Sequence, residues 1–179
     1  MSRTVEDGGD PTFSPATGPD PRDLLARDDV RFRAKVHEPD AEAFEAARDR
    51  IDGGLDWGVG ALVERDGELL LVRQDDRWML PGGGVERGES HTEALVRELA
   101  EETGLDVDPG PLRAVVENRY VRGDDEVGFH FALYEAAAGS RAVTDDPGLA
   151  DEGIESVGWF GSLPRDTLDR DLLADLRRA

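Results

Sequence analysis

The stretch WMLPGGGVERGESHTEALVRELAEETGL, residues 78–105, joins three consecutive glycines to a segment rich in glutamate. The apolar residues of its second half recur with the spacing of a helix. On that helix Glu98 and Glu102 lie one turn apart, and Glu101 lies close beside them. Like charges at this spacing destabilise an isolated helix, so the cluster needs a physical reason.

The sequence also predicts where this helix begins and which face it buries. Ser90 and Glu93 form a capping box at its start, and His91 is expected on the surface. The residues that share the predicted buried face are Leu95, Val96, Leu99 and Thr103. The glutamates are therefore expected at the rim of the buried face, where the helix meets the core.

Three carboxylates at such a rim would hold a hard divalent cation, because Mg²⁺ and Mn²⁺ prefer oxygen ligands. A bound cation would turn the repulsion between the glutamates into attraction. A chain this rich in acids also gathers some glutamates on a solvated face without forming a site. The helix alone does not decide between these two interpretations.

The whole stretch decides it, because its residues resemble the Nudix box at every fixed position. These positions are Gly83, Glu89, Arg97, Glu98, Leu99, Glu101, Glu102, Gly104 and Leu105. The flanking residues Trp78, Leu80 and Pro81, and the segment VGWF near the C-terminus, are also similar to the family. The resemblance covers residues 55–179 and leaves the N-terminal third uncovered.

Members of the Nudix family are typically hydrolases of a nucleoside diphosphate linked to another group X. The resemblance implies that Glu98, Glu101 and Glu102 ligate Mg²⁺, or Mn²⁺ in its place. The backbone carbonyl of Gly82 or Gly83 would add a further oxygen ligand.

The same resemblance assigns roles to the other residues of the stretch. Glu89 and Arg97 would hold the loop and the helix in register through an ion pair. The general base varies within the family. Glu98 is the first choice for it here, and a loop glutamate such as Glu126 or Glu152 is the alternative.

Three residues outside the glutamate cluster are candidates for binding the substrate. Arg73 ends a predicted strand and would place a fixed cation on the phosphates, although an exposed surface arginine explains it equally well. Trp78 and Tyr120 could stack on a base, whereas aromatic residues in a small domain more often belong to the core. A tyrosine at position 120, where ADP-ribose pyrophosphatases tend to have proline, tilts the prediction away from ADP-ribose.

Composition narrows the class of protein. The formal net charge is −20, from 41 acidic and 21 basic residues, and Lys35 is the only lysine. This combination resembles the cytoplasmic proteins of salt-accumulating halophiles, including haloarchaea, in which salt screens the repulsion. An acidic protein of an ordinary cytosol is the alternative. The chain lacks a basic stripe for a nucleic-acid backbone and an apolar run of membrane-spanning length, so we expect a cytoplasmic protein.

Two other functions share the expected fold. A catalytically silent Nudix-fold domain that binds or senses a nucleotide usually lacks box glutamates, and this chain keeps all of them. An isomerase of the isopentenyl diphosphate type relies on a catalytic cysteine, and this chain contains no cysteine. A small-molecule nucleotide is thus the expected partner.

The pattern along the chain predicts an α/β (α+β) fold around a mixed sheet, and the resemblance to the Nudix family implies that it is an α/β/α sandwich. Residues 1–22, rich in proline and glycine, are expected to form a disordered leader. Residues 23–54 are expected to form a helical extension in two pieces, serving as a docking helix or a homodimer contact. In the Nudix domain, residues 55–179, a hairpin at Asp66-Gly67 and two strands around residues 122–126 precede a last strand and a helix carrying Leu168, Leu172 and Leu176.

Overall fold

The structure is a computed structural model that describes residues 2–7, 9–27, 29–146 and 153–178. The chain forms two compact units, each built from several segments. Unit 1 comprises residues 1–59, 84–91 and 112–133, and unit 2 comprises residues 60–83, 92–111 and 134–179.

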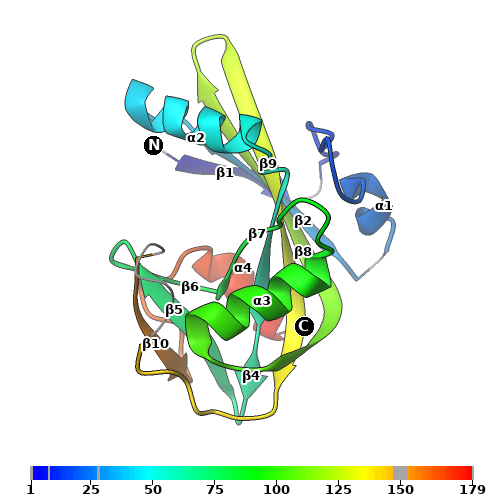
Figure 1. The fold of residues 1–179 in the computed structure, drawn as a ribbon. Helices are drawn as coiled ribbons and strands as arrows, with labels where there is room; N and C mark the ends of the chain where they lie inside the picture. Colours follow the sequence, from blue (N-terminus) through cyan, green and yellow to red (C-terminus); the bar gives the residue numbers. More distant parts are fainter. Residues whose placement is uncertain (1, 8, 28, 147–152, 179) are drawn as a thin grey trace. The chain divides into compact units, whose positions relative to one another are not determined.

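Helices and strands are present in both units, as expected for an α+β fold (Figure 1). Unit 1 contains β1 (Ser2–Asp7), α1 (Pro21–Leu25), β2 (Arg31–His37) and α2 (Ala41–Asp52). Unit 2 contains β4 (Glu64–Arg65), β5 (Glu68–Gln74), β6 (Arg77–Met79), β10 (Ile154–Phe160), α4 (Arg170–Arg178) and all but the first residue of α3 (His91–Thr103). Both units receive residues from β3 (Trp57–Leu62), β7 (Gly82–Gly84), β8 (Val107–Arg122) and β9 (Asp125–Ala138).

The larger sheet is mixed, as the sequence predicted. Its strand order is β1-β2-β8-β9-β3-β7. In unit 1, β2 runs parallel to β8, with Arg31 opposite Ala114 and His37 opposite Tyr120, whereas β1 runs antiparallel to β2. The parallel pair joins segments about 80 residues apart, a connection that local sequence patterns do not reveal.

The second of the two helical pieces expected within residues 23–54 is α2. The side chain of Asp40 accepts a hydrogen bond from the backbone N–H of Ala43 at 2.9 Å and so caps its N-terminus, and Gly53 forms its C-cap. Phe44 is buried, and Arg48 pairs with Asp125 on β9 at 3.4 Å. Figure 1 accordingly shows α2 beside the hairpin of β8 and β9.

The N-terminal third differs from the expectation in two ways. Residues 1–22, expected to be a disordered leader, include β1 and a segment whose backbone N–H groups bond to distant carboxylates. Residues 23–54, expected to be helical, include the strand β2 between the two helical pieces α1 and α2. In both cases the partner lies far away in the sequence, so local composition could not indicate it.

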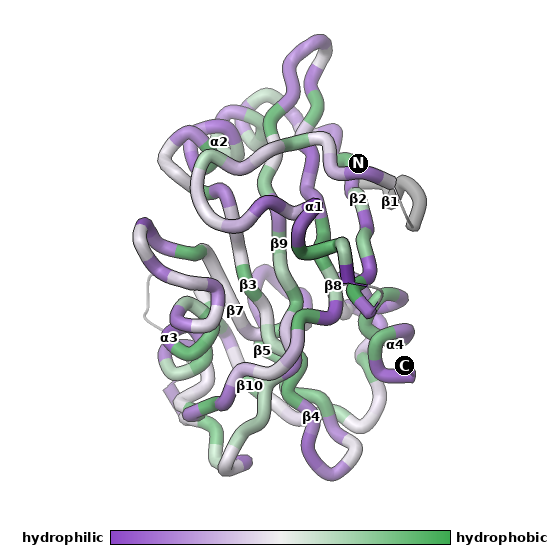
Figure 2. Tube along the Cα trace, turned by 90° about the vertical axis from the view of Figure 1, so that its right-hand side faces the viewer, coloured by the Kyte–Doolittle hydropathy of each residue, from purple (hydrophilic) through white to green (hydrophobic). Residues whose placement is uncertain are grey.

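Unit 2 contains the predicted hairpin. Asp66 and Gly67 have φ angles of 53° and 79°, the left-handed values that a tight two-residue turn requires, and Arg65 pairs with Glu68 directly across it. Strand β5 supplies a fully buried run, Leu69 to Val72, and pairs antiparallel with the predicted last strand, β10. Figure 2 shows this concentration of hydrophobic residues along β5.

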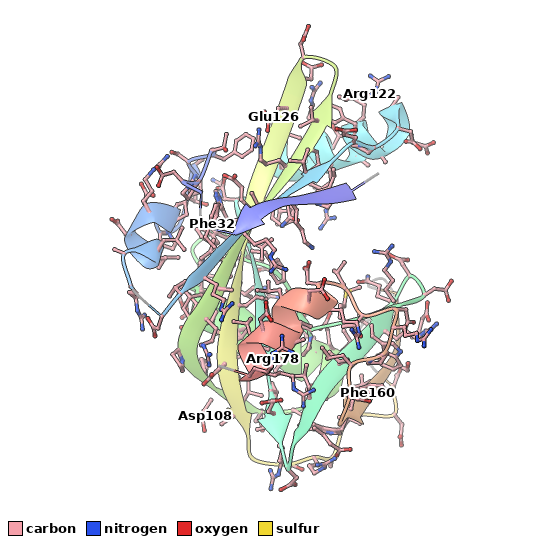
Figure 3. The ribbon with its side chains drawn as sticks, turned by 180° about the vertical axis from the view of Figure 1, so that it is seen from behind. Phe32, Asp108, Arg122, Glu126, Phe160 and Arg178 are labelled. Atoms are coloured by element: carbon pink, nitrogen blue, oxygen red, sulfur yellow. The ribbon has the colours of Figure 1, made fainter. Side chains whose placement is uncertain are left out.

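Two helices cover unit 2, and Figures 1 and 3 show α3 and α4 on opposite sides of it. Helix α4 buries Leu172, Leu173 and Leu176. Leu168, expected on the same stripe, precedes the helix and is 37% exposed. Among the described residues, no helix combines the length and the hydropathy needed to cross a membrane.

Candidate active site

Helix α3 begins directly after Ser90, as predicted, but its buried face differs from the expected one. Leu95, Leu99 and Thr103 are fully buried, whereas Val96 is 38% exposed. Glu98 and Glu102 are only 6% and 5% exposed. At about 100° per residue, the buried residues centre on Glu102, so these two carboxylates lie within the buried face and not at its rim.

The carboxylate of Glu102 is held by the glycine-rich strand β7. Its Oε2 accepts a hydrogen bond from the backbone N–H of Gly82 at 2.8 Å. A charge-assisted hydrogen bond of this kind compensates part of the cost of burying a carboxylate. The contact joins the glycine strand to the helix.

The carboxylate of Glu98 packs directly on the backbone of Gly83. A Cβ atom added at Gly83 would lie 2.5 Å from Oε1 and 2.7 Å from Oε2 of Glu98, so only glycine leaves room for this carboxylate. Arg97 donates from Nη1 to Oε1 of Glu98 at 2.8 Å and reaches Oε2 of Glu101 at 3.4 Å. One guanidinium therefore bridges two of the three box glutamates.

The charges of this cluster suit a divalent cation. Three carboxylates and the guanidinium of Arg97 leave a formal charge of −2, and two of the carboxylates are buried. Uncompensated buried charge costs several kcal/mol per ion, and Mg²⁺ and Mn²⁺ favour carboxylate oxygens. No three acidic or imidazole side chains in the described part of the chain are already arranged around a metal position, so a cation would compete with Arg97 for the same oxygens.

Glu89 lies in the loop before α3, where it stabilises a turn. Its carboxylate accepts a hydrogen bond from the backbone N–H of Glu86 at 3.0 Å, and its own N–H bonds to the carbonyl of Glu86 at 3.1 Å. Glu89 belongs to unit 1 and Arg97 to unit 2. The ion pair predicted between them stays a prediction.

Arg73 and Trp78 lie together in unit 2. The guanidinium of Arg73 is 5.7 Å from the centre of the Trp78 ring, and Phe160 packs against the same ring at 4.5 Å. Arg73 also contacts three carboxylates at 3.2–3.5 Å, those of Glu155, Asp166 and Asp76. A phosphate would have to compete with these three acids for the guanidinium of Arg73. The predicted contact between Arg73 and the substrate phosphates stays a prediction.

Tyr120, the third substrate candidate, belongs to an aromatic cluster in unit 1. Its ring stacks on His37 with centroids 4.7 Å apart, Phe129 lies 6.4 Å away, and burial raises the pKa of the phenol. Glu126, an alternative general base, is bound at 2.5 Å by Arg119 and lies near the outer end of β9 (Figure 3). Glu152, the other alternative, lies outside the described residues.

A buried polar cluster in unit 1 escaped the sequence interpretation. Glu117 on β8 and His130 on β9 are each 1% exposed, and their Oε1 and Nε2 atoms are 3.4 Å apart. Burial raises the pKa of Glu117, but His130 and two backbone N–H groups outweigh that effect and lower it. His91, expected on the surface, is buried 4.7 Å from Trp57, and burial lowers its pKa to about 4.

Comparison with solved structures supports the fold. A MutT NUDIX hydrolase from Burkholderia pseudomallei superimposes with a TM-score of 0.51 at 26% identity, covering 68% of this chain and 96% of that chain. The match therefore spans nearly the whole length of that neighbour and about two thirds of this chain.

Sequence comparison identifies the family. An 8-oxo-dGDP phosphatase of Danio rerio, NUDT18, is 34% identical over 151 residues, which cover 78% of this chain and 44% of that protein. A CTP pyrophosphohydrolase of Escherichia coli is 47% identical over 58 residues, 29% of this chain and 43% of that protein. The chain spans less than half the length of these curated relatives. The model of the NUDIX domain matches residues 54–163, and the chain therefore belongs to the NUDIX family.

Proposed function

We propose that this protein is a Mg²⁺-dependent hydrolase, active also with Mn²⁺, that cleaves a phosphoanhydride bond in a nucleoside diphosphate linked to a group X. The observation that carries the proposal is the pair of buried carboxylates, Glu98 and Glu102, each fixed against the glycine strand. Carboxylates confined in this way keep their oxygens oriented, which is the preorganisation that a metal-assisted hydrolase needs.

The divalent cation, when bound, neutralises the phosphates and activates water for attack on phosphorus. Glu98, Glu101 and Glu102 are the residues we propose to hold it, together with a backbone carbonyl of Gly82 or Gly83. Arg97 would orient Glu98 and Glu101, because it bonds to both of them.

Glu98 is also our choice for the general base. Its Oε1 already accepts a hydrogen bond, and its carboxylate is shielded from solvent, which strengthens its electrostatic interactions. Glu126 stays the alternative; its carboxylate is bound by Arg119, as that of Glu98 is by Arg97, but it is less shielded from solvent.

A nucleotide substrate is supported by two relatives, one named for 8-oxo-dGDP and one for CTP. The two names differ in base and in phosphate number, so they support the class of substrate and leave X open. Both compounds contain a phosphoanhydride bond. We propose that the glutamate cluster, through its cation, acts on that bond.

The test is turnover of a substrate panel in molar KCl with Mg²⁺ or Mn²⁺. The panel contains normal and oxidised dNTPs and dNDPs, ADP-ribose, dinucleoside polyphosphates, nucleotide sugars and NADH. We expect release of a nucleoside monophosphate or of phosphate from at least one member. No turnover on any member would contradict the hydrolase and favour a nucleotide-binding domain.

Two variants link turnover to the cluster. Glu98→Gln and Glu102→Gln should each lower kcat by about 10²-fold or more, since each removes a carboxylate that orients or charges the site. Glu45→Gln on α2 is the matched control, because Glu45 is an exposed acid paired only loosely with Arg48 at 3.7 Å. Equal kcat for all three variants would refute the assignment.

We further propose that the protein works in a salt-rich cytoplasm. The excess of acids, 41 against 21 basic residues, supports this setting, because screening at molar salt shortens the range of repulsion to about 3 Å. In unit 2, single arginines such as Arg73 and Arg141 each form ion pairs with more than one acidic side chain. That arrangement limits local repulsion where acids outnumber bases.

A further inference from the structure

The segment that joins β1 to α1 is fastened to unit 1 by hydrogen bonds to two carboxylates. We call residues 10–20 the strap. Its first fastening point is Glu117 on β8, whose Oε1 accepts from the backbone N–H groups of Thr12 at 2.6 Å and Phe13 at 2.9 Å. Two consecutive N–H groups therefore share one carboxylate oxygen.

The second fastening point is Asp56, which directly precedes β3. Its Oδ1 accepts from the backbone N–H of Ala16 at 3.1 Å. Its Oδ2 accepts from both the N–H and the hydroxyl of Thr17, at 3.0 and 2.6 Å. Hydrogen bonds to an ionised acceptor are the stronger kind, so these two carboxylates hold the strap in register.

Apolar packing contributes little to this attachment. Within the strap only Pro11 is buried, and Phe13 is half-buried against Gly128. Most other strap residues are exposed. A segment with few buried apolar contacts opens at a lower free energy than the core beneath it.

Polar groups that lack hydrogen bonds lie in the region that the strap encloses. The side chains of Trp57, Glu117 and His130 are at most 2% exposed. Nε1 of Trp57 and Oε2 of Glu117 have no hydrogen-bond partner, and Nε2 of His130 faces only Oε1 of Glu117, at 3.4 Å. The rings of Trp57 and His130 are 5.0 Å apart. Gly18 closes over the indole, since a Cβ atom there would lie 2.8 Å from Cδ1 and 3.1 Å from Nε1 of Trp57.

The closed arrangement therefore combines two opposing effects. The carboxylate hydrogen bonds favour it, whereas enclosing Nε1 of Trp57 and Oε2 of Glu117 without partners disfavours it. Opening would let water reach the indole, the imidazole and the second oxygen of Glu117. Because these two effects oppose each other, we expect the strap to have two accessible states, closed and open.

We propose that residues 10–20 form a releasable strap, locked by Asp56 and Glu117, that gates access to the polar cluster of Trp57, Glu117 and His130. The strap moves as a unit, so that releasing it at Asp56 also frees the N–H groups held by Glu117. When open, the cluster presents a carboxylate, an imidazole and an indole N–H to solvent.

Amide hydrogen exchange, followed by NMR on the full chain in molar salt, tests this proposal. Asp56→Ala removes one fastening point, and Gly18→Ala pushes the strap from the indole without touching either carboxylate. Both variants should accelerate exchange at Thr12 and Phe13 by at least about tenfold, the effect of losing a charge-assisted bond. Exchange of the indole N–H of Trp57 should accelerate with them.

Asp10→Ala is the matched control, because it removes an exposed acid from the same strap without removing either fastening point. The amide of Leu70, which is buried and donates to the carbonyl of Val63 at 3.0 Å, reports on unfolding of the core and should keep its wild-type exchange rate. Unchanged exchange at Thr12 and Phe13 in both variants would overturn the proposal. So would acceleration at Thr12 and Phe13 without acceleration at the indole of Trp57, because the strap would then not gate the cluster.

Discussion

Gly83→Ala is the substitution that probes the candidate site most selectively. The added Cβ would lie 2.5 Å from Oε1, 2.6 Å from Cδ and 2.7 Å from Oε2 of Glu98. Unstrained contacts between carbon atoms lie at about 3.5–4.0 Å, so either the carboxylate or strand β7 must move by about 1 Å. The carboxylate is the end of a flexible side chain, and we expect it to move first.

The expected loss follows from what that movement breaks. Displacing Glu98 disrupts its 2.8 Å bond with Arg97 and withdraws an oxygen from the proposed cation site. Overpacking of this kind costs about 1–3 kcal/mol of stability. A misplacement of about 1 Å in a catalytic constellation lowers kcat by about 10²-fold, and we expect a loss of that order.

Gly84→Ala is the matched control, since it alters the next residue of the same strand. Its added Cβ would meet only Leu55 Cδ1, at 3.4 Å, which is an ordinary contact. The assay is kcat for the best substrate of the panel at saturating Mn²⁺, with thermal unfolding of both variants alongside. If Gly83→Ala kept kcat within about twofold of Gly84→Ala, Glu98 would not need its present position for turnover.

Three further predictions concern stability. The free energy of unfolding should fall by about 3 kcal/mol as the pH drops from 6.5 to 4, because burial lowers the pKa of His91 to about 4 and protons then bind preferentially to the unfolded chain; denaturant titrations across this range that show no decline for wild type relative to His91→Asn would contradict it. Leu99→Ala should cost about 2–5 kcal/mol and Val96→Ala less than about 0.5 kcal/mol, since Leu99 is fully buried and Val96 is 38% exposed; similar losses in chemical unfolding would mean that the buried face of α3 is misassigned. Stability should rise as KCl increases from dilute buffer to about 1 M, where the Debye length falls to about 3 Å, and circular dichroism melts independent of salt would argue against a salt-adapted protein.

Elements that depend on local pattern could be predicted from the sequence. The hairpin at Asp66-Gly67 follows from the left-handed angles that these two residues tolerate, and α2 is the second of the two helical pieces expected within residues 23–54. Helix α3 starts directly after Ser90, where the predicted capping box of Ser90 and Glu93 places its first residue.

Elements that depend on distant partners could not be predicted in this way. Strand β2 forms because β8 offers a parallel neighbour, and residues 10–20 are fastened by Glu117 and Asp56. The composition of each segment alone favoured a helix and a disordered leader. A carboxylate that collects backbone N–H groups from a remote segment has no signature in either segment.

The glutamates of the candidate site illustrate the same division. Their spacing placed Glu98 and Glu102 on one side of a helix, which the structure confirms. Their burial was not predicted, because the spacing of apolar residues places the leucines at the centre of the buried face and the glutamates at its edge. The two carboxylates are buried because Gly82 and Gly83 make room for them and Gly82 donates a hydrogen bond. The exposure of Val96 follows from that shift of the face.

Binding of Mn²⁺, followed by electron paramagnetic resonance in molar KCl, tests the central claim most directly, because it requires no knowledge of X. Wild-type protein should bind Mn²⁺ saturably, and Mg²⁺ should displace it. The double variant Glu98→Gln/Glu102→Gln should lose that binding while keeping the wild-type circular dichroism spectrum. Equal Mn²⁺ binding by the folded double variant and by the wild type would contradict the claim that these buried carboxylates form the metal site.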